Sequence, residues 1–289
     1  MNGILLIDKE PGWTSSDVVV KLKGILHERR VGHAGTLDPM ATGLLTVFVG
    51  RATRAVEFAE AHDKRYLASL RLGVTTDTQD ITGNVLREEP VQIGEEALSE
   101  ALSRFLGEIQ QVPPMYSAIR VGGKRLYEIA RTGGEIERPP RPVTIHDIKL
   151  LGREGEDWLL DISCSKGTYI RTLCHDIGQV LGCGGCMSAL RRTAAGVFSV
   201  SDAITIGQAQ RLGAEGTLSE RMLPVDTLFR REKSCTVSKT EEKRIRCGTA
   251  FQTALPDGLY RVYGNSGDFL MLGRAENGIM KTVKSFFEV

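Results

Sequence analysis

The order of apolar and polar positions along the chain predicts strands and helices that alternate irregularly. Short apolar runs bounded by glycine, proline or polar turns are typical of strands. Such runs occupy residues 3–8, 43–50 and 64–73, and two more follow each other within 142–165. Because several of these strands succeed one another directly, the pattern favours an α+β fold, with a mixed, largely antiparallel central sheet flanked by helices.

Helical periodicity is clearest in two segments. Six apolar residues between 97 and 106 form one stripe and predict a helix within 94–107. The segment 168–182 has a similar apolar face and ends at a glycine, as helices commonly do. Three weaker signals predict a helix capped by Ser15 or Ser16, a helical segment at 51–61 and a polar loop at 75–84.

Two stretches differ from the rest of the chain. Residues 113–142 are bounded by prolines and carry six Arg or Lys against three Glu, which indicates a basic insertion on the surface. After residues 224–226 the helical stripes stop, and from about 231 short β-like runs between glycine-rich turns fit a small β-barrel. We therefore expect one large domain over 1–230, which contains the insertion, and a small β domain over 231–289.

The composition is ordinary for a globular protein, with 41% hydrophobic and 25% charged residues. The net charge is +1, so a polyanion would have to bind a local basic patch. Neither a signal peptide nor a membrane helix is evident, so we expect a cytoplasmic protein whose six cysteines are free thiols. Cys183 and Cys186 form a single pair, which favours a glycine-rich turn over a metal site, because structural zinc commonly needs two such pairs.

The stretch GHAGTLDPMATG, residues 32–43, raises the question of chemistry. It holds three glycines, His33 and Asp38, and little that could build a core. Asp38 followed by Pro39 is typical of a helix start or a turn, because aspartate caps helices and proline fits the first helical position. Taken alone, the stretch reads as an exposed turn, Asp38 as a structural residue and His33 as a loop residue bonded to a backbone carbonyl.

Three other places hold residue types suited to a binding pocket. Lys64 and Tyr66 open a strand, Tyr169 and Arg171 lie at a strand-to-helix junction, and Leu190 follows in a third element. Each has a plain structural explanation, because a tyrosine can simply pack and most arginines pair with a surface acid. The residues by themselves do not choose between these interpretations.

Seven stretches, taken together and in order, resemble the TruB-type tRNA pseudouridine-55 synthases. They are DKEPGWTS (8–15), HAGTLDPMATG (33–43), KRY (64–66), LGVTTDTQD (72–80), PPMYSAIRVGGKRLYEIAR (113–131), CSKGTYIRTLCHDIG (164–178) and ALRRT (189–193). GTLDP and SKGTYIR are specific in combination. The tail at 231–289 resembles, more loosely, a PUA-type RNA-binding domain.

This resemblance implies the pseudouridine synthase fold over 1–230 and the conversion of uridine to pseudouridine at position 55 in the tRNA T loop. Asp38 would be the catalytic aspartate, acting as nucleophile, as base at C2′ or as stabiliser of a cationic sugar. Arg171 would hold that carboxylate ionised and oriented. Tyr66 would stack on the base and take the C5 proton, Tyr169 would line the pocket and Leu190 would contact the base.

The same resemblance implies that the target base is flipped out of the RNA. His33 would fill the space that the base vacates, Lys64 would lie near the phosphates or support the site, and the 113–142 insertion would clamp the T arm. The reaction changes no oxidation state, so we expect neither a metal nor an organic cofactor. The expected partner is the tRNA T stem-loop; we expect a monomer, with no obligate protein partner and no membrane association.

Three alternatives stay open at this stage. An RNA-guided relative from ribonucleoproteins shares similar motifs but usually carries longer basic tails. A non-catalytic protein that assists tRNA folding would have no need of Asp38, Tyr66 and Arg171 together. A glycosidase is disfavoured because it commonly uses two carboxylates, and no second one is obvious in the sequence.

Overall fold

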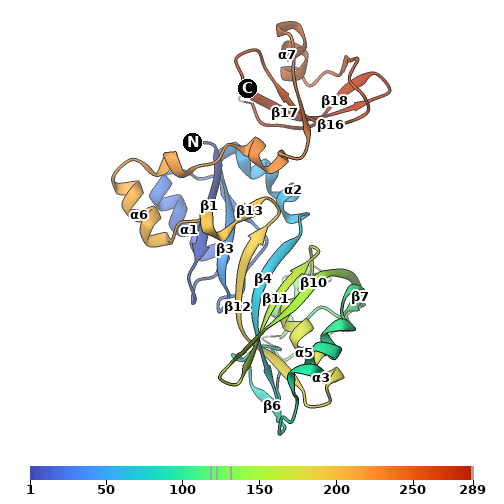
Figure 1. Ribbon diagram of the computed structural model, residues 1–289. Helices are drawn as coiled ribbons and strands as arrows, with labels where there is room; N and C mark the ends of the chain where they lie inside the picture. Colours follow the sequence, from blue (N-terminus) through green and yellow to red (C-terminus); the bar gives the residue numbers. More distant parts are fainter. Residues whose placement is uncertain (118, 122, 131, 288–289) are drawn as a thin grey trace.

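The computed structural model describes residues 1–117, 119–121, 123–130 and 132–287. Within these ranges nine strands form the main sheet, seven of them in the order β1-β3-β12-β4-β11-β10-β7. Strand β2 pairs with β3, and β13 pairs with β12. All of these pairings are antiparallel except β3 with β12, which meet in parallel. The predicted mixed, largely antiparallel sheet is therefore confirmed (Figure 1).

Strands β1, β3, β4, β10 and β11 follow the predicted apolar runs, whereas β2, β7, β12 and β13 were not predicted. They are β1 (Gly3–Lys9), β2 (Val31–Ala34), β3 (Thr42–Val49), β4 (Lys64–Leu72), β7 (Gly107–Gln111), β10 (Arg141–Glu154), β11 (Asp157–Cys164), β12 (Gly185–Ala195) and β13 (Phe198–Ser199). Two small hairpins stand apart: β5 (Val74–Thr76) with β6 (Val85–Glu88), and β8 (Arg120–Val121) with β9 (Lys124–Arg125).

The helices of the main body are α1 (Ser15–Leu26), α2 (Val56–Glu60), α3 (Glu95–Ser103), α4 (Leu126–Ala130), α5 (Ile170–Val180) and α6 (Ile206–Ala214). Short 3-10 turns cover Gly50–Ala55, Val200–Asp202, Leu218–Arg221 and Val225–Phe229. None of the helices within the described ranges is long and apolar enough to cross a membrane. The helices predicted within 94–107 and 168–182 are confirmed, because α3 and α5 lie within these ranges.

Two of the hydrophobic cores pack α1, α3, α5 and α6 against the main sheet. One buries apolar side chains of α3 and α5 against β4, β11 and β12, with Leu98, Leu160 and Leu173 fully buried at its centre. The other buries α1 and α6 against β1 and β3. Figure 1 shows α3 and α5 at one end of the long sheet and α1 and α6 near the other. Strand β4 runs between the two parts and carries Lys64 and Tyr66 at its start.

The C-terminal region forms a second sheet. Its strands are β14 (Lys233–Thr236), β15 (Phe251–Gln252), β16 (Gly258–Tyr263), β17 (Phe269–Glu276) and β18 (Ile279–Ser285), in the order β14-β16-β17-β18-β15, with helix α7 (Lys239–Arg246) beside them. The end strands β14 and β15 do not pair with each other in the part of the chain described, so the sheet is a curled half-barrel. The β-rich character expected from the sequence is confirmed.

An aromatic cluster joins the two sheets. Phe229, just before β14, packs edge-on against Phe58 with ring centres 5.4 Å apart. On its other side Phe229 lies 6.0 Å from Phe286 and 6.1 Å from Phe269 of the C-terminal sheet. The N-terminal end of the chain lies near this junction (Figure 1). Burying these rings fixes the half-barrel against the main body.

Several local predictions need correction. Helix α1 is capped by Thr14, and not by Ser15 or Ser16, because Thr14 and Asp17 form a reciprocal capping box. The helical segment at 51–61 begins as a 3-10 turn before α2. The stretch 75–84 includes strand β5 and buried side chains, so it is not simply a polar loop.

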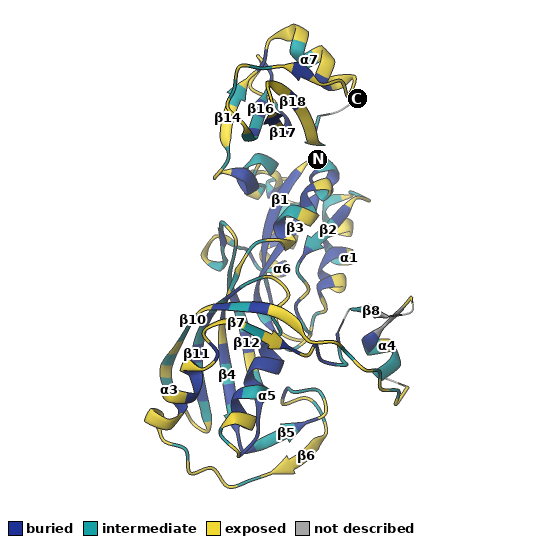
Figure 2. Ribbon diagram, turned by 90° about the vertical axis from the view of Figure 1, so that its right-hand side faces the viewer, coloured by how far each residue is buried: buried dark blue, intermediate teal, exposed yellow. Residues whose placement is uncertain are grey.

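The basic insertion at 113–142 projects from the body. Figure 2 shows β8 and α4 standing away from the sheet, connected by extended chain. The predicted RNA clamp includes residues 118, 122 and 131, which lie outside the described residues. At its base the guanidinium of Arg138 donates to the carbonyl of Pro113 at 3.3 Å. The insertion therefore closes on itself where it leaves the body.

Candidate active site

The turn that carries Asp38 is fastened to the connection between β1 and α1. The Ser15 hydroxyl accepts a hydrogen bond from the amide of Leu37 at 2.9 Å and donates to its carbonyl at 3.1 Å. The buried ammonium of Lys9 donates to the carbonyl of Pro39 at 3.2 Å. Burial lowers the pKa of Lys9 to about 8, while the nearby Asp38 carboxylate opposes that shift. These contacts hold the backbone on both sides of Asp38.

The turn is less exposed than its composition indicated. Leu37 and Ala41 are buried and belong to the core under the sheet. The amide of Ala41 donates to the carbonyl of Asp38 at 3.0 Å, which closes a turn and does not start a helix. The side chain of Asp38 is 37% exposed, so its carboxylate is open to a substrate while its backbone is fixed.

Arg171, at the start of α5, holds the Asp38 carboxylate through two nitrogens. Its Nε lies 3.0 Å from Oδ2 of Asp38, and its Nη2 lies 3.4 Å from Oδ1. Nη2 also donates to the carbonyl of Tyr116 at 2.8 Å, and Nη1 donates to that of Thr78 at 3.1 Å. Since the guanidinium side chain is 6% exposed and bound on every side, it orients the carboxylate rigidly.

Asp80 is a second carboxylate on the same guanidinium, and no role was predicted for it from the sequence. Its Oδ2 lies 3.4 Å from Nη1 of Arg171, and the aspartate side chain is 7% exposed. Its Oδ1 accepts from the amide of Thr82 at 3.0 Å and from both hydroxyls of Thr78 and Thr82. The only sequence signal was that the stretch 72–80 contributes to the family resemblance.

A glycosidase was disfavoured from the sequence because no second carboxylate was obvious. Asp80 is such a carboxylate, so this reason does not hold. The two acids are nevertheless not equivalent. Asp38 is partly open, whereas Asp80 is enclosed by threonines and lies behind the arginine. Burial raises the pKa of Asp38 above the ordinary value of 3.8, Arg171 opposes this, and the like charge of Asp80 adds to it.

Two further candidates lie in the core beneath this arrangement. Tyr66, on β4, is 8% exposed, and Leu190, on the neighbouring strand β12, is equally buried. Both belong to the hydrophobic core that includes Leu37, next to Asp38. Burial raises the pKa of the Tyr66 phenol, whose other charged or ionisable neighbours are Arg192, Cys164 and Asp38.

Tyr169 is held by backbone contacts at the N-terminal end of α5. Its amide donates to the side-chain oxygen of Gln111 at 2.8 Å, and the Gln111 amide group donates back to its carbonyl at 3.0 Å. The tyrosine lines a cavity of about 340 Å³ together with Gln111, Arg141 and Lys166. This cavity combines an aromatic ring with two cationic side chains, which are groups that suit RNA, and Glu60 also lines it.

His33 and Lys64 are near the same site but make no hydrogen bond or ion pair to Asp38 or Arg171 within the described chain. The Nδ1 of His33 is buried without a described partner, and burial lowers the pKa of its ring. Lys64 donates to the backbone carbonyls of Glu60, at 2.6 Å, and His62. Burial lowers the Lys64 pKa to about 8. The Lys64 ammonium thus holds the backbone of the segment that connects α2 to β4.

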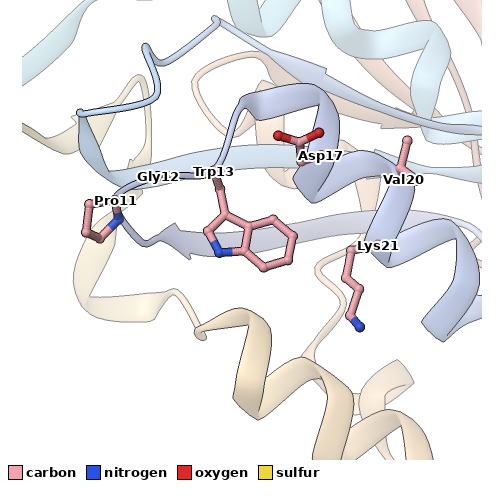
Figure 3. A pocket seen from close by; sticks show the side chains of 6 residues that line it. All are labelled: Pro11, Gly12, Trp13, Asp17, Val20 and Lys21. Carbon is pink, nitrogen blue, oxygen red and sulfur yellow. The ribbon is translucent and has the colours of Figure 1, made fainter. Parts of the chain in front are cut away.

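A second hollow, of about 620 Å³, opens beside the β1–α1 connection. Figure 3 shows the Trp13 ring between Pro11 and Gly12 on one side and Asp17 and Lys21 of α1 on the other. Its wall is linked to the site, because the amide of Gly12 donates to the carbonyl of Pro39 at 2.8 Å. Asp38 itself does not line this hollow.

The pair Cys183 and Cys186 takes no part in this arrangement. Cys183 and Cys186 are buried free thiols, and burial raises the pKa of Cys186 to about 11. Among the described residues no group of three or more histidine, cysteine, aspartate or glutamate side chains is placed to hold a metal ion.

Comparison with protein families gives two adjoining matches. Residues 23–170 match the TruB family pseudouridylate synthase N-terminal domain, and residues 171–230 match the tRNA pseudouridylate synthase B C-terminal domain. The chain is 42% identical over 292 residues to the tRNA pseudouridine synthase B of Clostridium kluyveri, covering 99% of this chain and 100% of that protein. It is 47% identical over 248 residues to that of Alkaliphilus oremlandii, covering 86% and 82%.

Solved structures show the same fold. A chain from the crystal structure of a Cbf5-Nop10-Gar1 complex matches with a TM-score of 0.76 at 26% identity, over 99% of this chain and 85% of that chain. A chain from an H/ACA RNP bound to a substrate RNA containing 2′-deoxyuridine matches with a TM-score of 0.74 at 24% identity, over 99% and 85%.

Proposed function

Because the chain belongs to the TruB family of pseudouridylate synthases, we propose that it converts uridine to pseudouridine at position 55 in the T loop of tRNA. At the level that its relatives establish, it is a tRNA pseudouridine synthase and therefore an isomerase. The finer proposal is a cytoplasmic monomer that acts without a guide RNA, a protein partner, a metal or an organic cofactor. The observation that carries it is the partly open Asp38 carboxylate clamped by Arg171.

One carboxylate is sufficient for this isomerisation, since the leaving base is also the returning nucleophile and no water has to be activated. Asp38 has the freedom to approach the sugar, because its side chain is 37% exposed while its turn is pinned by Ser15 and Lys9. Attack at C1′, removal of the C2′ proton and stabilisation of a cationic sugar all use the ionised form. Arg171 favours that form against the effect of burial.

The base would be held by residues from three strands or junctions. Tyr66 would stack on the uracil and accept the C5 proton in the last step, with Leu190 on the apolar side of the base. Tyr169 would form the wall that continues into the cavity with Arg141 and Lys166. The buried positions of Tyr66 and Leu190 around Leu37 support this arrangement.

Reaching C1′ requires the target nucleotide to leave its stack. His33 would occupy the vacated space, and its partly buried ring, whose pKa is lowered by burial, suits stacking. Lys64 would support the site or approach a phosphate after releasing its carbonyl acceptors. We assign residues 1–230 to the catalytic domain, with the 113–142 insertion clamping the T arm, and residues 231–289 to a PUA-like RNA-binding domain.

The decisive experiment uses the purified protein and an unmodified T stem-loop RNA, with EDTA present. Carbodiimide labelling and primer extension locate any pseudouridine formed by the wild type and by Asp38→Asn. We expect one stop at the T-loop uridine for the wild type and none for the variant, with RNA binding retained by both. Tight binding without modification by the wild type would refute stand-alone catalysis.

A guided enzyme or an RNA-folding factor is the second candidate, favoured by the likeness to chains from Cbf5-containing and H/ACA RNP structures. These matches are 24–26% identical and concern the fold, whereas the full-length tRNA pseudouridine synthase B relatives are 42–47% identical. The same stem-loop assay separates the candidates, because a guided enzyme modifies nothing without its guide.

A further inference from the structure

Arg192, on β12, is a buried cation without a counter-charge. Its residue is 1% exposed, and no described carboxylate lies within ion-pair distance of it. The preceding residue, Arg191, shows the usual arrangement instead: it is 40% exposed and pairs with Asp8 at 2.7 Å. Enclosing a charge without a partner is costly, so such a group is retained for a reason.

Two of the three guanidinium nitrogens are used by the backbone. Nε donates to the carbonyl of Leu44 at 2.7 Å, and Nη2 donates to the carbonyl of Gly35 at 2.9 Å. Gly35 allows the guanidinium to approach closely, because a Cβ at this position would lie only 3.2 Å from Nη1 of Arg192. The backbone φ of Gly35 is +70°, which also favours glycine. Nη1 itself has no carbonyl or carboxylate acceptor within the described part of the chain.

The neighbour of this guanidinium is the phenol of Tyr66. Tyr66 and Arg192 are direct cross-strand partners on β4 and β12, and both side chains are buried. Burial has the larger effect on the Tyr66 phenol and raises its pKa. The guanidinium lies close enough for its charge and its N–H groups to lower that pKa in part. Arginine can only donate hydrogen bonds, so towards Arg192 the phenol oxygen can only be an acceptor.

Two lysines share these surroundings. The charge of Arg192 lowers the pKa of Lys9 and Lys64, and also that of the His33 ring, and the three residues come from three other strands. Arg192 and the two lysines therefore make these surroundings positive. If Arg192 served only to hold β12 against the chain around Asp38, its two hydrogen bonds to the carbonyls of Leu44 and Gly35 would be sufficient. The third nitrogen and the uncompensated charge indicate an additional task.

We propose that Arg192 is the positioning residue for the Tyr66 hydroxyl during proton removal from C5. This rests on the proposed function. In the isomerisation C5 loses one proton and N1 gains one, so the group that accepts the C5 proton must pass a proton on. The Tyr66 hydroxyl gives its proton towards N1 of the base, and its oxygen then takes the proton from C5, which restores the phenol. Arg192 holds that oxygen in place and stabilises the negative charge that it carries between the two transfers.

The test uses two variants at 192 and one matched control. Arg192→Lys keeps the charge, Arg192→Gln keeps a donor without the charge, and Arg191→Lys changes the exposed neighbour on the same strand. Single-turnover rates are measured on T stem-loop RNA carrying either hydrogen or deuterium at C5 of the target uridine. Each variant is assayed at a temperature at which its melting curve shows it folded, and its RNA dissociation constant is measured separately.

We expect both Arg192 variants to lose about 10- to 100-fold in rate, in the range of a general acid–base contribution, with little change in RNA affinity. Their C5 isotope effect should exceed that of the wild type, because C5–H cleavage becomes slower relative to the other steps. In a Tyr66→Phe background, Arg192→Gln should cost little more, since there is no hydroxyl left to position. Arg191→Lys should match the wild type.

A rate loss with an unchanged isotope effect, or one that adds fully to that of Tyr66→Phe, would overturn the proposal and leave Arg192 as a structural brace. Wild-type rates in both variants would overturn it as well. Failure of the proposed function is a separate result, because the wild type itself would then form no pseudouridine.

Discussion

Removing the charge of Asp80 should slow the reaction although this residue is enclosed and does not face the substrate. Arg171 is shared between two carboxylates, with Nε 3.0 Å from Asp38 and Nη1 3.4 Å from Asp80. Asp80 thus fixes the side of the guanidinium opposite to the catalytic acid. In Asp80→Asn the amide can keep bonds to Thr78 and Thr82, but it no longer attracts the arginine.

The magnitude follows from what the variant loses. Arg171 retains Asp38 and the carbonyls of Thr78 and Tyr116, so it is not left as an unpaired buried charge. The loss is therefore that of one hydrogen bond to a charged group, about 1.5–3 kcal/mol. If this orientation is needed in the transition state, the rate falls by about 10- to 150-fold.

Single-turnover pseudouridylation of a T stem-loop RNA measures this loss directly. Asp77→Asn is the matched control, because Asp77 lies in the same turn and contacts Asn84 but not Arg171. Thermal unfolding confirms that both variants are folded at the assay temperature. A wild-type rate in Asp80→Asn, or an equal loss in Asp77→Asn, would refute the reasoning.

The remaining predictions concern ionisation, the sheet junction and the thiols. Because burial raises the pKa of Asp38, the rate should fall on acidification through a limb above the ordinary value of 3.8, and Arg171→Met should move that limb to higher pH, as pH–rate profiles will show. Phe229→Ala should cost about 3–5 kcal/mol in denaturant unfolding if the junction unfolds together with the main body; a minor loss would mean that the half-barrel docks weakly. Near neutral pH, iodoacetamide should label the exposed Cys247 and spare buried Cys186, whose pKa is raised to about 11, as peptide mass mapping will test.

Much of the architecture was predictable because its signals are local. The apolar stripe of α3, the amphipathic α5 and the short apolar runs of β1, β3 and β4 each lie within one stretch of chain. The family resemblance singled out Asp38 and Arg171, and the structure brings them into contact across 133 positions of sequence. Their catalytic roles stay predictions.

Errors arose where local rules allow several outcomes. Thr14, Ser15 and Ser16 all have side chains that can cap a helix. Thr14 is the N-cap because Asp17, three residues later, completes a capping box with it. Asp38-Pro39 suits a helix start as well as a turn, but the following chain enters β3 and pairs with β1, which excludes a helix.

By itself, the sequence determined part of the architecture, including β1, β3, β4, α3 and α5, and it showed which residues have the chemistry for a reaction at a sugar. Only the tertiary structure decided the electrostatic environment of those residues. Asp80 looked like part of a polar loop, and Arg192 like one of two equivalent arginines, until folding buried both. The physical reason is that the energy of a charge depends on burial and on partners distant in sequence, and neither is encoded in the local pattern of residues.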